Sequence, residues 1–309
     1  MYQSTHLKQK HIRTSVHSWS HHDGALAILK VWSDNMRDTA PSIIVKQSRR
    51  GLLRSALLRN YSIPVWVQDG ARFGENGIDL SFDEILVRVV KLRHAYKTLV
   101  QHRDLEVELV ETLNNEARDL DKASRMWEAE LPQKWTYTTH SIPGAWPRTG
   151  LYSLILYTYS RRCYAAVWLQ YFAVRMLVMD TLLSLLHITC AKDPSVRNSS
   201  HQQELLKCRT QLKLIIDGLA STIPFSLGRI NLGMTNDKNS MLAPTLNSDE
   251  SIPPHLAIHA VWPLAVALNL DGVELEMRQW FRGTLVRLGS VLGDGSLECA
   301  VSNGELTRN

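Results

Sequence analysis

The most apolar stretch of the chain, 151–186, limits the fold more than any other feature of the sequence. A helix that spans a membrane needs about 18 or more uninterrupted apolar residues. Here the run is interrupted by polar and charged residues at Arg161, Arg162, Gln170, Arg175 and Asp180. The stretch therefore predicts a central helix that is buried on most sides, rather than a membrane span.

Apolar residues also recur at helical spacing along most of the remaining chain. Between Leu105 and Leu131 they follow steps of three and four, which places them on one face of a helix. The segment S-F-D-E at 81–84 fits a capping box, so another helix is predicted to begin at Ser81. Further helices are predicted over 17–32, 41–61, 201–222, 253–268 and 273–291. Convincing alternating β segments are absent, so we predict an all-α fold with long antiparallel helices around 151–186.

Length and composition predict a folded chain. It has 309 residues, of which 44% are apolar and 21% are charged, as in globular proteins. We predict a single domain over 1–309, with helical parts at 1–132 and 151–309 and a connector at 133–150. The polar segment 228–252 is predicted to be a mobile loop, because loops of this length are uncommon inside compact domains unless they have a function.

Charge and cysteine content argue against several classes of protein. The net charge of +5 is small, and the charges are mixed along most of the chain. The four cysteines lie far apart and form no C-x-x-C pair, which argues against both a Cys-rich zinc site and a disulfide scaffold. Residues 1–13 are polar and lack the apolar segment of a signal peptide, which predicts an intracellular protein without membrane contact.

Several clusters that could bind a ligand have ordinary structural interpretations. The pairs His17 and His21, and His255 and His259, are each four residues apart, as metal ligands on a helix can be. Apart from Asp23 no acidic or thiol ligand accompanies them, so we predict no metal site. A basic stretch contains Lys46, Arg49, Arg50, Arg54 and Arg59. Of these, Arg50, Arg54 and Lys46 share one helix face, which is interpreted as a solvated face rather than a DNA contact.

Signatures of enzymes are also missing. The chain contains no G-x-G-x-x-G, P-loop, H-E-x-x-H, G-x-S-x-G or EF-hand motif. The paired carboxylates Asp83 and Glu84 are predicted to lie in the first turn of a helix, where they complement the helix dipole. We therefore predict that the protein is not an enzyme and has no cofactor.

One aromatic set is the candidate site. Trp168, Tyr171, Phe172 and Arg175 lie at helical spacing, and a cation among apolar walls can orient an anionic or carbonyl group. The alternative, which we favour, is a packed core in which Asp180 or backbone carbonyls satisfy Arg175. Trp262 is included as a further candidate for this ligand pocket or core network.

A series of short motifs, in order from Trp19 to about Leu292, resembles one family: the regulatory (middle-homology) region of fungal zinc-cluster transcription factors. The motifs are W-S-H-H-D-G-A-L-A-I-L at 19–29, the arginine-punctuated helix that ends in I-P at 50–64, L-P-Q-K-W-T-Y at 131–137, A-V-W-L-Q-Y-F-A-V-R at 166–175, A-S-T-I-P-F at 220–225, P-P with W-P-L at 253–264, and R-Q-W at 278–280. The chain departs from the family pattern at Leu169, where Asn is frequent, and at Phe172, where Arg is frequent.

The resemblance implies a function in transcription by RNA polymerase II, in the nucleus, with the transcription machinery or related factors as partners and a small-molecule effector. Family members carry an N-terminal cluster of six cysteines that binds two zinc ions and reads DNA. In this chain the first cysteine is Cys163. We therefore expect an N-terminally truncated regulatory domain that binds neither zinc nor DNA itself. A cytoplasmic location is the alternative if the missing part is truly absent.

Three alternatives stay open at this point. The chain could be a DNA-free interaction protein that acts by heterodimerising, and would then expose an apolar face. It could be a non-functional fragment, which would leave core surface bare and aggregate. An all-α small-molecule enzyme is the third alternative, and it requires convergent titratable groups that the sequence does not show.

Overall fold

The computed structural model of the chain describes residues 23–35, 39–101, 107–142, 150–192, 199–233, 243–247 and 251–294. Helices account for most of these residues, which confirms the predicted all-α class. The chain forms two compact units, Met1–Arg103 and Asp104–Asn309, called unit 1 and unit 2 below. The division between them falls ahead of the segment 133–150, in which we predicted the connector.

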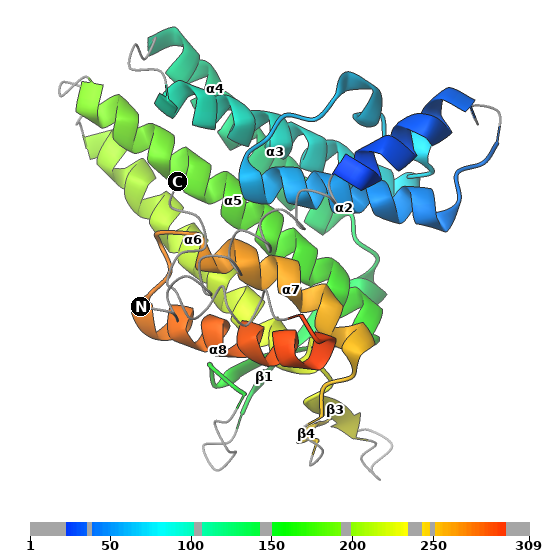
Figure 1. Cartoon of the computed structure of the whole chain (residues 1–309). Coiled ribbons are helices and arrows are strands. Elements are labelled where there is room, and N and C mark those ends of the chain that lie inside the picture. The colour runs from blue at the N-terminus through cyan, green and yellow to red at the C-terminus, as the bar shows by residue number, and fades with distance from the viewer. Residues whose placement is uncertain are drawn as a thin grey trace, which may run out of the picture. The chain divides into compact units, whose positions relative to one another are not determined.

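Unit 1 consists of helical segments that appear in blue and cyan in Figure 1. Its elements are a helix over 23–35, α2 (Ile43–Arg59), the short 3-10 turns η1 (Val65–Val67) and η2 (Ala71–Phe73), and α3 (Gly77–Gln101). The hydroxyl of Ser42 accepts a hydrogen bond from the backbone N–H of Val45 and so caps the start of α2. Asn60 ends α2 in a left-handed conformation with φ of 54°.

The helices α2 and α3 run parallel to each other, unlike the antiparallel helices that we predicted around 151–186. Arg49 of α2 binds Asp83 of α3, and further along both helices Asn60 accepts a hydrogen bond from Arg93. Parallel neighbours need a connection that returns along the first helix. The segment 61–76 makes this return, since Val67 and Gly74 lie beside successively earlier residues of α2.

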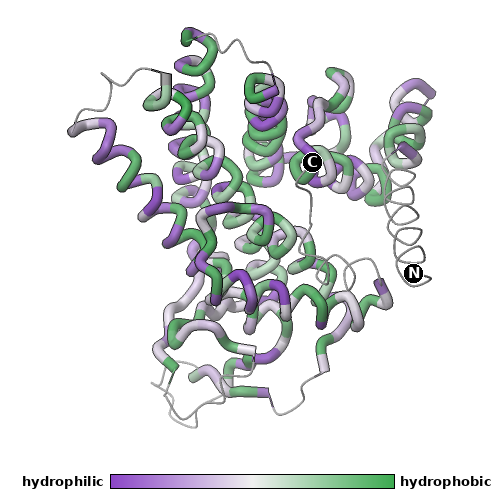
Figure 2. The backbone as a smooth tube through the Cα atoms, turned by 60° about the vertical axis from the view of Figure 1, so that its left-hand side comes forward, coloured by the Kyte–Doolittle hydropathy of each residue, from purple (hydrophilic) through white to green (hydrophobic). Residues whose placement is uncertain are grey.

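The core of unit 1 lies where these segments meet. Its buried members come from helix 23–35, α2 and both short turns; they are Leu29, Val45, Leu52, Val67 and Phe73. Trp32 and Trp66 pack around them, with ring centroids 5.4 Å and 6.5 Å from that of Phe73. The hydropathy tube in Figure 2 shows green and purple residues alternating along many helices, as expected where one face is buried.

Unit 2 is built around α5. Its elements are α4 (Val107–Ala129), η3 (Gln133–Trp135), β1 (Tyr137–Ser141), β2 (Ile155–Tyr159), α5 (Arg162–Lys192), α6 (Ser199–Ser226), β3 (Ile230–Gly233), β4 (Ala243–Leu246), α7 (Pro254–Leu268) and α8 (Leu275–Leu292). Figure 1 shows α5 between α4 and α6, and both neighbours pack against it along much of its length.

Side-chain contacts show that α4 and α6 both run antiparallel to α5. Near one end of α5, Thr189 accepts a hydrogen bond from Asn114 of α4, and the Leu186 carbonyl contacts His201 of α6. Near the other end, Phe172 lies beside Gly218 of α6. The prediction of a central apolar helix between antiparallel partners is therefore confirmed for unit 2.

The central helix begins later than predicted, at Arg162 rather than at residue 151. The segment Ile155–Tyr159 forms β2 instead, because its alternate aromatic and β-branched residues suit a strand. By length and composition Arg162–Ala191 could cross a membrane. However, 67% of its most apolar 18-residue window is buried inside the fold, as in the core helix of a globular domain.

Two small antiparallel sheets correct the expectation that strands are absent. β1 and β2 pair with Tyr137 opposite Tyr159 and Ser141 opposite Ile155, so the predicted connector at 133–150 contains a strand. β3 and β4 pair with Ile230 opposite Leu246, and they occupy part of the predicted loop at 228–252. Each strand is only four or five residues long, which is too short to give a clear alternating pattern in sequence.

The helices α5 and α6 pack tightly at Gly218, and this gives a first prediction. A Cβ atom added there would lie 2.9 Å from two carbons of the Phe172 ring. We expect Gly218→Ala to lower the free energy of unfolding by about 1–3 kcal/mol, because overpacking outweighs the gain in helix propensity. The measurement is urea denaturation followed by circular dichroism.

The matched control is Gly283→Ala on α8, where an added Cβ meets nothing within 4 Å. This variant should be neutral or stabilise the protein by up to about 1 kcal/mol. Equal effects of the two substitutions would show that α5 and α6 do not pack as closely as described.

Candidate functional site

The candidate residues Trp168, Tyr171 and Arg175 lie together on α5, and Tyr171 and Arg175 meet α4. The Nη2 atom of Arg175 donates a hydrogen bond of 2.8 Å to Asp121 of α4, and its Nη1 atom donates one of 3.2 Å to the Tyr171 hydroxyl. Glu128 of α4 is a more distant ionic partner, at 3.9 Å from Nη1. We call Asp121, Glu128, Tyr171 and Arg175 the Arg175 network.

The prediction that Asp180 pairs with Arg175 is wrong. A residue five positions along a helix points to a different side, so Asp180 cannot share the face on which Arg175 meets α4. The carboxylates come from α4 instead, at positions 54 and 47 residues earlier in the chain than Arg175. Such distant pairing leaves no local sequence signal.

Tyr171 and Arg175 are buried, and their environment explains their chemistry. The Tyr171 hydroxyl donates a short hydrogen bond to the Glu128 carboxylate. Burial raises the pKa of Tyr171 well above its ordinary value, and the hydrogen bond to Glu128 acts in the same direction. Tyr171 is therefore a neutral hydrogen-bond donor at physiological pH and holds no proton that it could readily give up.

An aromatic cluster surrounds this network. The indole N–H of Trp168 donates a 2.8 Å hydrogen bond to the backbone carbonyl of Trp135. Its ring meets Tyr137 and Tyr171 edge to face, with centroids 4.8 Å and 5.3 Å away. Trp127 of α4 stacks on Tyr171 at 5.6 Å. The aromatic walls of the candidate site thus contact one another, as side chains in a packed core do.

Trp262, the fourth candidate, lies on a different helix. It is buried on α7, whereas the contacts of the Arg175 network join α4 and α5. The Arg175 Nε atom is buried and has no hydrogen-bond partner in the structure.

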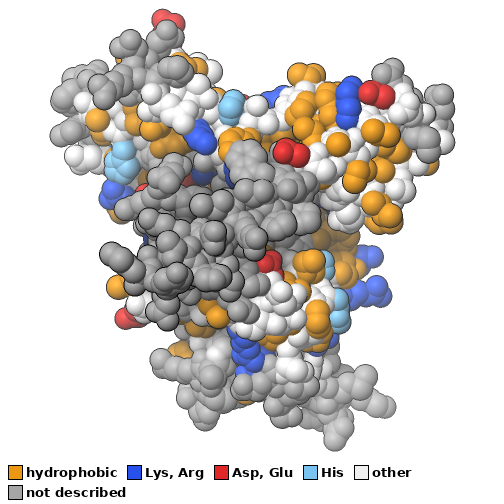
Figure 3. Space-filling model, viewed as in Figure 1, with side chains coloured by type: hydrophobic (Ala, Val, Ile, Leu, Met, Phe, Trp, Pro, Cys, Tyr) orange, Lys and Arg blue, Asp and Glu red, His pale blue; other side chains and the backbone are white. Residues whose placement is uncertain are grey.

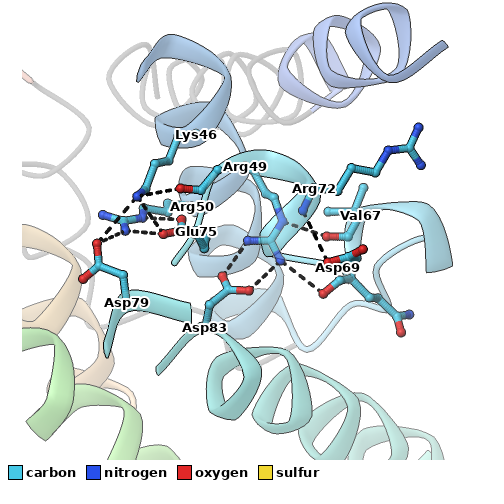
Figure 4. Close-up of polar contacts among 11 residues, drawn as sticks. Lys46, Arg49, Arg50, Val67, Asp69, Arg72, Glu75, Asp79 and Asp83 are labelled. Atoms are coloured by element: carbon cyan, nitrogen blue, oxygen red, sulfur yellow. Dashed lines mark hydrogen bonds and ion pairs between the residues drawn. The ribbon is translucent and has the colours of Figure 1, made fainter. Parts of the chain in front are cut away.

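A second polar network, in unit 1, was not recognised from the sequence (Figure 4). Arg49 is 0% exposed, and its guanidinium binds both carboxylate oxygens of Asp83, at 2.5 Å and 2.8 Å. It also donates to the carbonyl oxygens of Val67 at 2.7 Å and Gln68 at 3.3 Å. Arg49 therefore fastens α3 and the return segment 61–76 to α2.

The neighbouring cations complete the network. Arg50 binds the buried carboxylate of Glu75 through two of its nitrogen atoms and reaches Asp79 at 3.0 Å. Lys46 contacts Glu75 at 3.0 Å and donates to the carbonyl of Gly74. The interpretation as a solvated helix face is wrong for Arg50 and Lys46, because the carboxylate of Glu75 from later in the chain covers them.

The position of Asp83 also corrects a prediction about α3. The helix begins at Gly77, and Ser81 lies inside it, where its hydroxyl donates to the Gly77 carbonyl. Asp83 is consequently a buried partner of Arg49 rather than a residue that complements the helix dipole in the first turn. One signal could have indicated this arrangement: acidic residues at 75, 79 and 83 recur at steps of four, opposite a helix without acidic residues.

Metal-ligating and thiol side chains are the remaining candidates within the described ranges. Among these residues no group of three or more His, Cys, Asp or Glu side chains is arranged to hold a metal ion. His17 and His21 lie outside the described residues, whereas His255 and His259 both lie on α7. Cys208 is buried, which raises the pKa of its thiol to about 11, while Cys163 is exposed.

These two cysteines give a second prediction. In the folded protein at pH 8, iodoacetamide should modify Cys163 and leave Cys208 unmodified, because a thiol must be accessible and ionised to react. Peptide mass spectrometry of native and urea-unfolded samples measures both sites. Equal labelling of both sites in the native sample would contradict the burial of Cys208, which lies on α6.

Comparison of the chain with family models, with curated proteins and with solved structures finds no match to any of them.

Proposed function

We propose that the chain is the regulatory domain of a fungal zinc-cluster-type RNA polymerase II transcription factor and contains no DNA-binding cluster of its own. The ordered series of motifs from Trp19 to about Leu292 is the basis of this proposal. It agrees with the all-helical class, which the family implies. The partners proposed are the transcription machinery or related factors, in the nucleus.

One observation carries most of the weight: motif segments that are distant in sequence contact one another. Trp168, from the motif at 166–175, donates its indole hydrogen bond to Trp135 of the motif at 131–137. Phe225 and Thr222, from the motif at 220–225, contact Tyr159 of β2, and the Tyr159 ring lies 6.4 Å from that of Trp168 in the motif at 166–175. The motifs at 131–137, 166–175 and 220–225 therefore contribute to one core, which supports the proposal that they belong to one domain.

The mechanism proposed is control by conformation. An effector or partner that binds one arrangement of the helices better than another shifts the equilibrium between them. The Arg175 network is the place proposed for a small effector, because the buried Nε of Arg175 offers an unused donor. The segment 228–252 is proposed to take part in the same switch.

A reporter assay tests the proposal. The full chain is fused to the DNA-binding domain of an unrelated bacterial repressor, in a fungal host with a reporter of intermediate basal expression. We expect the fusion to change expression in either direction relative to the DNA-binding domain alone, and Trp168→Ala to abolish the change. A fusion that reaches the nucleus at the level of the control and leaves expression unchanged would contradict the proposal.

The effector step needs a separate variant. We expect that replacing 231–246, which includes most of β3 and all of β4, with a Gly-Ser linker of equal length changes the level of reporter expression relative to the unchanged fusion. Met126→Ala, at an exposed position of α4, is the matched control and should respond as the unchanged fusion does. If the linker variant also responds unchanged, the segment has no regulatory role.

An interaction protein that acts by pairing with other chains is the second candidate. Exposed apolar side chains on helix 23–35 favour it. The two candidates differ in the reporter assay, since an interaction protein alone need not alter transcription when it is brought to DNA.

A further inference from the structure

Helix 23–35 has apolar residues on two opposite faces. Its inner face contributes Leu29 to the core of unit 1, with Leu26 and Trp32 packed partly against that core. Its outer face carries four apolar or small residues at spacings of three, one and three, which lie on one side of a helix. We call Gly24, Ala27, Ile28 and Val31 the outer stripe; all four are exposed.

The outer stripe leaves large side chains in water. Ile28 is 56% exposed and Val31 is 61% exposed. Figure 3 shows hydrophobic side chains gathered over the part of unit 1 that contains this helix. A single exposed apolar residue needs no explanation, but a row at helical spacing is typical of a helix that packs against a partner.

The order of sizes along the outer stripe indicates which partner fits. The small residues, Gly24 and Ala27, come first, and the large residues, Ile28 and Val31, come last. If two such helices lie antiparallel, Gly24 faces Val31 and Ala27 faces Ile28, so that each large side chain meets a small one. A two-fold interface has this reciprocal property.

Charges beside the stripe support the same arrangement. Asp23 and Lys30 lie on one flank of the helix, within two turns of each other. In an antiparallel pair Lys30 of each copy comes near Asp23 of the other, in addition to its own contact with Asp34 at 3.0 Å. Opposite charges across an interface fix the register of the two helices.

We propose that helix 23–35 pairs antiparallel with the same helix of a second copy of this chain, through the outer stripe. This dimer is independent of the proposed function in transcription, since a chain without effect on a reporter could still pair. The helix is about 20 Å long at 1.5 Å per residue. Pairing of two such short helices buries less than the roughly 800 Å² per partner of a standard interface. We therefore expect a dissociation constant of about 1–100 μM.

Analytical ultracentrifugation of the full chain from about 1 to 300 μM tests the pairing, a range set by the affinity expected. Ile28→Glu should raise the dissociation constant about tenfold or more, because a carboxylate would be buried at the centre of the interface. The matched control is Leu206→Glu on α6, where the side chain is 66% exposed, and the constant should stay unchanged.

A substitution of Gly24 separates the specific pairing from general apolar association. A Cβ at Gly24 meets nothing within 4 Å in its own chain, so Gly24→Leu leaves the monomer intact and raises helix propensity. In the antiparallel pair the new side chain collides with the partner's Val31, and the dimer should weaken about tenfold. The double variant G24V/V31A places a small residue opposite a large one again and should restore the pairing.

Each contrary result overturns the proposal. A chain that is monomeric over the whole range has no such interface, and a stabilising effect of Gly24→Leu on the dimer would indicate non-specific association. A monomer that Ile28→Glu strongly destabilises would show that another part of the same chain covers the outer stripe. Urea denaturation of each variant separates loss of pairing from loss of folding.

Discussion

Asp83→Leu should lower the free energy of unfolding by about 3–5 kcal/mol, because it leaves a buried guanidinium without its counter-charge. Arg49 is fully buried, and two of its hydrogen bonds end on Asp83. The remaining acceptors, Val67 and Gln68, are uncharged carbonyl groups. Urea denaturation measures the total loss, and hydrogen exchange of α2 and α3 locates it in unit 1.

Removing both charges should cost much less than removing one. The double variant R49M/D83L replaces the pair with apolar side chains of similar size, and we expect it to recover about 2 kcal/mol or more relative to D83L. Glu274→Ala is the matched surface control, because Lys213 and Glu274 form an exposed pair. It should leave stability unchanged, and a loss equal to that of D83L would refute the special role of burial.

Trp168→Ala should be the most damaging single truncation in unit 2, with a loss of about 3–5 kcal/mol. The substitution removes a buried indole that touches Tyr137, Tyr171 and Phe172, and it leaves a cavity among them. Trp168→Phe keeps most of the apolar contact but loses the hydrogen bond to Trp135, and should cost about 1–2 kcal/mol. Thermal and urea denaturation measure both variants.

Met126→Ala serves as the control for this series, since its side chain is exposed on α4. Its effect should stay within about 0.5 kcal/mol of zero. If Trp168→Ala were as mild as this control, the motif segments at 131–137 and 166–175 would not form one core. The structural argument for the proposed function would then fail with it.

The all-α class and the central helix could be predicted because each depends on the hydrophobic pattern within a single continuous segment. Between Arg162 and Leu186 apolar residues lie on every side of the helix, which only a buried helix tolerates. α4 shows one apolar face, and its buried residues, among them Leu113, Leu120 and Trp127, recur at helical spacing. These features need no knowledge of which helices become neighbours.

The polar contacts could not be predicted for the opposite reason. Arg49 and Asp83 are 34 residues apart. Their sequence neighbours Arg50 and Glu84 carry the same charges, but neither of them is buried. Which charge becomes buried depends on where the return segment crosses α2. The same holds for Arg175, whose partners Asp121 and Glu128 are chosen by the packing of α4.

The parallel course of α2 and α3 has a consequence for the order in which unit 1 forms. The two helices cannot close as a local hairpin, because the segment 61–76 must first return along α2. Contacts between such distant positions form late and slow the search for the native state. During synthesis, the buried guanidinium of Arg49 therefore lacks its counter-charge until Asp83 has left the ribosome, so unit 1 cannot reach its full stability before α3 emerges.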